Sequence, residues 1–145
     1  MTRYLRLIPM VLMATFVSVV SAAETETDPA LIQIAGDSTL DDWLWLKRPV
    51  VVFADSPNDP RFVEQMRLLE ERSDALIARD VVVLTDTAPK ERGAIRKSLR
   101  PRGFMLAILA KDGTVVARKP APWDVREISR SIDKLPLRQQ EAREN

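Results

Sequence analysis

Three short apolar runs, separated by polar segments with helical spacing, most constrain the fold of this chain. The runs are Val50–Ala54, Val81–Leu84 (followed by the β-branched Thr85) and Phe104–Leu109. Continuous apolar runs of this length are typical of strands buried on both faces of a sheet. A helical segment joins the first two runs, so these strands should lie parallel with a right-handed crossover.

Helix and turn signals fill the rest of the chain. Asp59 precedes Pro60, the usual arrangement of a capping residue and a first helical residue. We expect helices over residues 60–78, 89–100 and 124–135, and a hairpin turn at Lys111–Gly113 followed by a strand over 114–118. The predicted order is β-α-β-α-β-β-α, an α/β fold with a four-stranded mixed sheet covered by helices.

The N-terminus has the layout of a secretory signal peptide. Arg3 and Arg6 precede an apolar run over residues 7–20, and small residues lead to a cleavage position after Ala23. A retained membrane anchor is the alternative, but the run is shorter than the roughly 20 residues that a span needs. We therefore expect a signal peptide (1–23), a flexible lead-in (24–38), a folded domain (39–136) and a polar C-terminal tail (137–145), for which a frayed helical turn is an alternative. The mature protein should be periplasmic or secreted, without a transmembrane span.

The chain contains no Cys and no His. This excludes disulfides, thiol redox chemistry, thiolate or imidazole metal sites, and Ser-His or Cys-His nucleophiles. The segment from Glu24 to Asp86 has 14 acidic and 6 basic residues, whereas Thr87 to Asn145 has 14 basic and 7 acidic residues. Such a dipolar chain can pair with a charged partner. We expect no cofactor, and no nucleic acid as a partner of an exported chain.

Two stretches resemble the thioredoxin family. Arg102–Gly113 is similar to the segment that reads R-G-I-P-T-L-L-L-F-K-N-G in thioredoxins, and Phe53–Arg61 falls on the segment that ends in C-G-P-C. The resemblance implies a thioredoxin-like fold. It places Asn58 and Arg61 at the positions of the two cysteines, and Met105 at the position of the cis-proline. Disulfide exchange requires thiolates, so oxidoreductase activity is excluded whatever the fold.

A combination of short motifs resembles a smaller group more closely. The motifs are D-W-x-W before Arg48-Pro49, V-V-F-A, N-D-P-R at Asn58–Arg61, and the K-D-G hairpin. They are similar to a cysteine-poor thioredoxin-like domain of unknown function found in small exported bacterial proteins, and in animal sushi-repeat and coiled-coil-domain extracellular matrix proteins. The resemblance implies secretion and a binding role, and it carries no catalytic activity over.

The loop after the first buried strand is the first candidate site. Ligands of open α/β sheets bind at the carboxyl ends of strands, where free N–H groups and an arginine can hold an anion. The candidate surface for a protein or an anionic ligand comprises Asp55, Asn58, Asp59, Pro60, Arg61 and Met105. The alternative is turn chemistry alone, with Asp59 as a helix cap and Arg61 paired with Glu64.

Carboxylates supply a second hypothesis, a cysteine-independent envelope hydrolase that uses Asp55 or Asp59. Paired carboxyls catalyse hydrolysis when the pKa of one is raised. The candidate acids are Asp41, Asp42, Asp55, Asp59 and Asp86. Their positions at helix starts favour structural roles instead, and their spacing matches no calcium loop, so we expect no metal.

A basic segment and two tryptophans complete the candidates. The basic patch comprises Lys90, Arg92, Arg96, Lys97, Arg100 and Arg102, and it suits an acidic protein, an anionic glycan or a lipid headgroup. A solvated helix face is the alternative interpretation. Trp43 and Trp45 could form an exposed anchor for a partner, but packing beneath the sheet edge is the more common role of such residues.

Overall fold

A five-stranded mixed sheet forms the centre of the structure, a computed structural model that describes residues 30–144. The strand order is β1-β3-β2-β4-β5. Their bounds are Ile32–Ile34 (β1), Arg48–Phe53 (β2), Val81–Asp86 (β3), Met105–Leu109 (β4) and Val115–Lys119 (β5). β1, β3 and β2 are mutually parallel, whereas β4 runs antiparallel to both β2 and β5. The predicted α/β fold with a mixed sheet is confirmed, with one strand more than expected.

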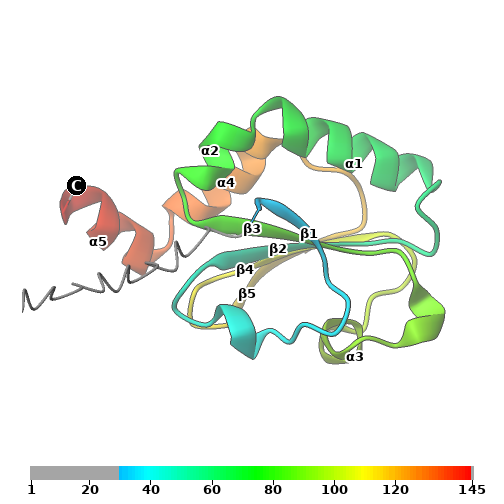
Figure 1. Ribbon diagram of the computed structural model, residues 1–145. Helices are drawn as coiled ribbons and strands as arrows, with labels where there is room; N and C mark the ends of the chain where they lie inside the picture. Colours follow the sequence, from blue (N-terminus) through cyan, green and yellow to red (C-terminus); the bar gives the residue numbers. More distant parts are fainter. Residues whose placement is uncertain (1–29, 145) are drawn as a thin grey trace, which may run out of the picture.

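Helices cover both faces of this sheet. α1 (Pro60–Glu71), α2 (Ser73–Ile77) and α4 (Val125–Asp133) lie on one face, and α3 (Ala94–Leu99) lies on the other (Figure 1). Side chains of β2 alternate between the two layers, with Val50 and Val52 in one core and Val51 and Phe53 in the other. Period-two alternation between two buried faces explains why the sequence of this strand is continuously apolar.

Three expectations about the elements were wrong. The lead-in predicted for residues 24–38 contains β1, which pairs with β3 in the register Ile32 to Val83. The long helix predicted over 60–78 is broken at Arg72, whose φ of −135° is not helical. The helix predicted over 89–100 is divided into a short 3₁₀ turn, η2 (Pro89–Glu91), and α3, because Arg92 between them has a left-handed φ of 49°. The polar C-terminal tail contains helix α5 (Pro136–Glu144), because Pro136 begins a helix as well as ending one.

Two short 3₁₀ turns lie in the connections between the main elements. η1 (Asp41–Trp43) and η2 (Pro89–Glu91) lie in the connections that precede β2 and α3. The predicted signal peptide lies outside the described residues. Within residues 30–144, no helix is long and apolar enough to cross a membrane.

Candidate functional site

The loop between β2 and α1 is organised by the cap of α1. Asp59 lies just before Pro60, the first residue of the helix, and its Oδ1 accepts the backbone N–H of Arg61 at 2.9 Å. The hydroxyl of Ser56 accepts the backbone N–H of Asn58 at 3.1 Å. The predicted cap is therefore confirmed, and the loop follows the usual chemistry of a helix start.

The Arg61 side chain is fixed by two neighbours. Its Nε and Nη2 donate to the two carboxylate oxygens of Asp59 at 3.2 and 3.0 Å, and its guanidinium lies 5.5 Å from the centre of the Phe104 ring. The pairing expected between Arg61 and Glu64 is wrong, because Glu64 binds Arg67 instead. Arg61 is 52% exposed, so one edge of its guanidinium still faces solvent.

Asp59 is held in its ionised form. Hydrogen bonds from the side chain and the backbone N–H of Arg61 lower the pKa of Asp59 below its usual value. At neutral pH it is a paired carboxylate, which is the state of a base and not of a general acid. Six residues of the loop, Asp55, Ser56 and Asn58–Arg61, line an open hollow of about 450 Å³.

A second, strongly basic pocket lies next to Met105. Met105 pairs with Phe53 across β4 and β2, so it lies at the same sheet edge as the Asp55–Arg61 loop. The pocket has a volume of about 270 Å³ and is lined by Arg100, Arg102, Phe104, Met105, Arg118, Lys119 and Pro120. Four of these side chains are cations, and no carboxylate lines the pocket.

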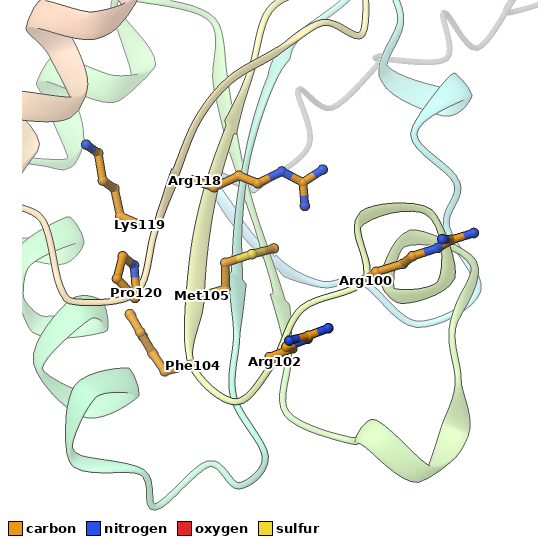
Figure 2. Close-up of a pocket in the computed structure, with 7 residues that line it drawn as sticks. All are labelled: Arg100, Arg102, Phe104, Met105, Arg118, Lys119 and Pro120. Atoms are coloured by element: carbon orange, nitrogen blue, oxygen red, sulfur yellow. The ribbon is translucent and has the colours of Figure 1, made fainter.

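Figure 2 shows how the strands distribute these side chains. Met105 and Arg118 extend toward the α3 side of the sheet, whereas Phe104 and Lys119 extend toward the opposite side. Arg118 also donates to the carbonyl of Leu99, which ends α3. Lys119 lies over the Trp123 ring, with its Nζ 4.1 Å from the ring centre. Two of the four cations are therefore oriented by neighbouring groups.

The structure divides the predicted basic patch. Arg100 and Arg102 line the pocket beside Met105, and no ion pair joins either of them to another described residue. Lys90 and Lys97 are exposed outside the pocket, as is Arg92. The predicted patch is thus brought only in part to the candidate site.

Arg96 is turned inward and does not belong to the exposed patch. Its Nε and Nη2 each bind a carboxylate oxygen of Asp86 at 2.9 Å, and Nη2 also donates to the carbonyl of Ala54. The guanidinium lies 5.3 Å from the centre of the Phe53 ring. Arg96 therefore links α3 to the ends of β2 and β3. Arg96 lies three residues before the buried Leu99, and residues three apart share one face of a helix. That spacing is a sequence signal that could have indicated the inward position of Arg96.

Sequence reasoning missed Arg118 and Lys119 as members of the pocket. Both follow the hairpin turn, and they reach the pocket because β5 pairs with β4 in the register Leu106 to Lys119. The signal available in the sequence was the pair of basic residues directly before Pro120. Without the strand register, nothing linked that pair to Arg100 and Arg102.

The candidate acids do not gather into a metal site. Asp86 is bound to Arg96 and Asp59 to Arg61. Asp42 accepts the backbone N–H of Thr39 at 2.8 Å. Among residues 30–144, no three acidic side chains are grouped in a way that could hold a metal ion.

The two tryptophans have different environments. Trp43 is half-buried and packs against the core on the α3 side, as expected for a packing role. Trp45 is 66% exposed, which contradicts the packing role for this residue. It lies near the first residue of β2, at the opposite end of that strand from the basic pocket.

Comparison with protein families places these features in a known group. The family described as "Domain of unknown function (DUF4174)" matches residues 39–141. The chain belongs to this family. The matched residues include the whole sheet except β1, together with α1 to α4 and the first two-thirds of α5. None of the curated proteins matches this DUF4174 chain.

Solved structures show the fold of the DUF4174 domain. Chloroplastic thioredoxin z is similar with a TM-score of 0.55 and 18% identity, covering 80% of this chain and 99% of its own. Desulfothioredoxin of Desulfovibrio vulgaris Hildenborough is similar with a TM-score of 0.53 and 17% sequence identity, covering 73% of this chain and 98% of its own. The reduced 2-Cys peroxiredoxin of Plasmodium vivax is similar with a TM-score of 0.56 and 14% sequence identity, covering 71% of this chain and 84% of its own. These likenesses confirm the thioredoxin-like fold.

Proposed function

We propose that this protein is an exported, non-catalytic thioredoxin-like domain that binds an anionic ligand or an acidic protein surface. The binding surface is the sheet edge formed by Asn58–Arg61, Met105 and the adjoining basic pocket. The observation that carries the proposal is the pocket itself, in which four cations gather without a lining carboxylate. Export rests on the basic and apolar pattern of residues 1–23.

The charges of this edge support an anionic partner. Arg100 and Arg102 have no acidic partner among the described residues, so neither charge is balanced within the domain. Arg118 is held at the end of α3 through the Leu99 carbonyl, which fixes its position before a ligand arrives. Preorganised guanidinium groups bind carboxylate, phosphate and sulfate through paired hydrogen bonds at a reduced entropic cost.

The composition supports binding without catalysis. The chain has no Cys or His, and Arg61 holds Asp59 as a carboxylate at neutral pH. The hydrolase alternative that uses Asp55 or Asp59 stays a prediction, and no contact in the loop favours it over binding.

Affinity capture from an envelope extract of the producing cell tests the proposal. The baits are the protein, the variant Arg100→Gln/Arg102→Gln, and the control Lys90→Gln/Lys97→Gln. The control removes the same charge from exposed positions outside the pocket. We expect an acidic protein or glycan to be retained by the wild type and the control, to be released by salt, and to be lost from the pocket variant.

A third variant separates the loop from the pocket. Asn58→Ala/Asp59→Ala/Arg61→Ala removes the polar groups of the loop and leaves the pocket cations in place. Loss of the same partner from this variant would support the loop as part of the binding surface, and retention would restrict that surface to the pocket. Equal retention by all baits would overturn the assignment of binding to this edge.

A further inference from the structure

A second cavity lies at the opposite end of the sheet from the proposed binding edge. Its volume is about 580 Å³, within the range of roughly 300–1,000 Å³ that is usual for small-molecule sites. Three segments form its walls: the residue Trp45 before β2, the β4–β5 hairpin from Ala110 to Val116, and the α4–α5 junction from Leu135 to Leu137. Apart from Arg48, Lys111, Asp112 and Thr114, the lining side chains are apolar.

The exposed apolar side chains around this cavity form one wall of a site. Trp45 is 66% exposed and Leu137 is 36% exposed, although both line the cavity. Trp45 also has a φ of +63°, a conformation that bulky residues rarely adopt. Its backbone N–H donates to the carbonyl of Lys111 at 2.7 Å and so fixes the residue against the hairpin. A strained residue that presents an indole beside a cavity points to a functional role.

The polar wall has hydrogen-bond donors without acceptors. Arg48 is fully buried, and its Nη1 and Nη2 bind the Arg79 carbonyl and the Glu141 carboxylate, both at 2.9 Å. Its Nε is buried and has no partner among residues 30–144. The Lys111 ammonium binds Asp80 and Glu141 at 2.8 and 2.9 Å, which uses two of its three N–H groups. Arg48 therefore has a buried Nε–H without an acceptor among the described residues, and Lys111 has one N–H left for a further acceptor.

Ion pairs beside the cavity hold these two cations in place. Linked salt bridges join four cations and three carboxylates: Arg48, Arg79, Lys111 and Arg138 with Asp80, Asp133 and Glu141. The remaining lining carboxylate, Asp112, accepts the backbone N–H of Thr114 in the hairpin turn. A ligand carboxylate in the cavity would accept the unused N–H groups of Arg48 and Lys111 through charge-assisted hydrogen bonds.

We propose that this cavity binds a small amphipathic carboxylate. Its apolar body packs against Trp45 and Leu137, and its carboxylate binds Lys111 and the Arg48 guanidinium. This site is independent of the basic edge near Met105, because the two lie at opposite ends of β2. It takes a different class of ligand, in which an apolar body supplies much of the affinity.

Titration with octanoate, followed by amide-resolved NMR, tests this site. Octanoate combines a carboxylate with an alkyl chain small enough for the cavity. We expect saturable shifts confined to the amides of the residues that form the cavity: Trp45 to Arg48, the hairpin from Ala110 to Val116, and the α4–α5 junction. Octan-1-ol has the same alkyl length without the charge, and it should bind at least about fivefold more weakly.

Two variants decide whether the tryptophan forms the site. Trp45→Asn removes the indole and places a residue that tolerates positive φ at this position, so the fold is preserved. It should weaken octanoate binding by about tenfold or more. Ile77→Ala is the control, because Ile77 is 57% exposed and lies outside the cavity, and it should leave the affinity unchanged.

Three results would overturn the proposal. The first is amide shifts with octanoate that do not saturate, or that spread to exposed apolar residues outside the cavity. The second is an equal affinity of Trp45→Asn and Ile77→Ala for octanoate. The third is an equal affinity of the wild type for octanoate and octan-1-ol. The last result would refute the carboxylate recognition specifically. None of them bears on the basic pocket, so this test is separate from the test of the proposed function.

Discussion

Replacing Arg96 with alanine should destabilise the domain far more than removing the neighbouring charge of Lys97. The side chains of Arg96 and Asp86 are only 11% and 10% exposed, so solvent screens their interaction little. The guanidinium makes two hydrogen bonds of 2.9 Å to the Asp86 carboxylate and one of 3.1 Å to the Ala54 carbonyl. Truncation leaves a largely buried carboxylate without its cation.

The expected magnitude follows from this geometry. Removing one partner of a buried ion pair costs about 3–5 kcal/mol. Asp86 keeps one donor, the backbone N–H of Ala88 at 3.1 Å, which favours the lower end of that range. We therefore expect Arg96→Ala to lower the free energy of unfolding by about 3 kcal/mol. For a domain of this size, that loss corresponds to a melting temperature lower by roughly 10–15 °C.

Urea unfolding followed by circular dichroism measures this loss. The control Lys97→Ala should change the free energy of unfolding by less than about 0.5 kcal/mol. The double variant Asp86→Ala/Arg96→Ala should cost less than the sum of its two single variants, because it leaves no unpaired charge. A loss for Arg96→Ala as small as that for Lys97→Ala would refute the reasoning and return Arg96 to the exposed basic patch.

Three further changes test other parts of the structure. Val52→Asp should abolish cooperative thermal unfolding, because it places an unpaired charge at a fully buried position of β2; a melt near that of the wild type would contradict the strand assignment. Gln65→Ala should lower the free energy of unfolding by about 2–3 kcal/mol in urea titrations, because the buried Gln65 amide makes two bonds of 2.8 Å to the main chain of Trp123; an unchanged midpoint would show that these bonds are dispensable. Burial raises the pKa of Glu141, but hydrogen bonds led by that from Lys111 outweigh it, so the net pKa lies below the ordinary value of 4.5. The stabilisation by this carboxylate is present above pH 4.5 and is lost as the pH falls through the lowered pKa. The free energy of unfolding of Glu141→Gln should therefore fall less steeply in acid than that of the wild type. An identical pH dependence of the two proteins would contradict the role of the ion pair.

The central sheet could be predicted because burial on both faces leaves a direct mark on sequence. Residues 50–54 and 81–84 are continuously apolar, and β2 and β3 begin or end within two residues of these runs. β1 leaves no such mark. It has three residues at the sheet edge and Ile34 is 83% exposed, so its position depends on hydrogen bonds to β3 that local sequence does not reveal.

The C-terminal helix and the basic pocket depend on long-range contacts in the same way. α5 has no buried residue, and it is anchored by the ion pairs of Glu141 with Arg48 and Lys111, which are distant in sequence. The pocket beside Met105 likewise needs the register of the hairpin to bring Arg118 to α3. The sequence could predict a basic segment, but it could not show which of its cations face solvent.

Binding of a sulfated polysaccharide tests the central claim most directly. We would titrate the protein with dextran sulfate in a calorimeter, with neutral dextran as the ligand control. The wild type and Lys90→Gln/Lys97→Gln should bind dextran sulfate and not dextran, with an affinity that falls as salt is added. Arg100→Gln/Arg102→Gln should bind about tenfold more weakly. Equal affinities of the two double variants would contradict the assignment of anion binding to the pocket beside Met105.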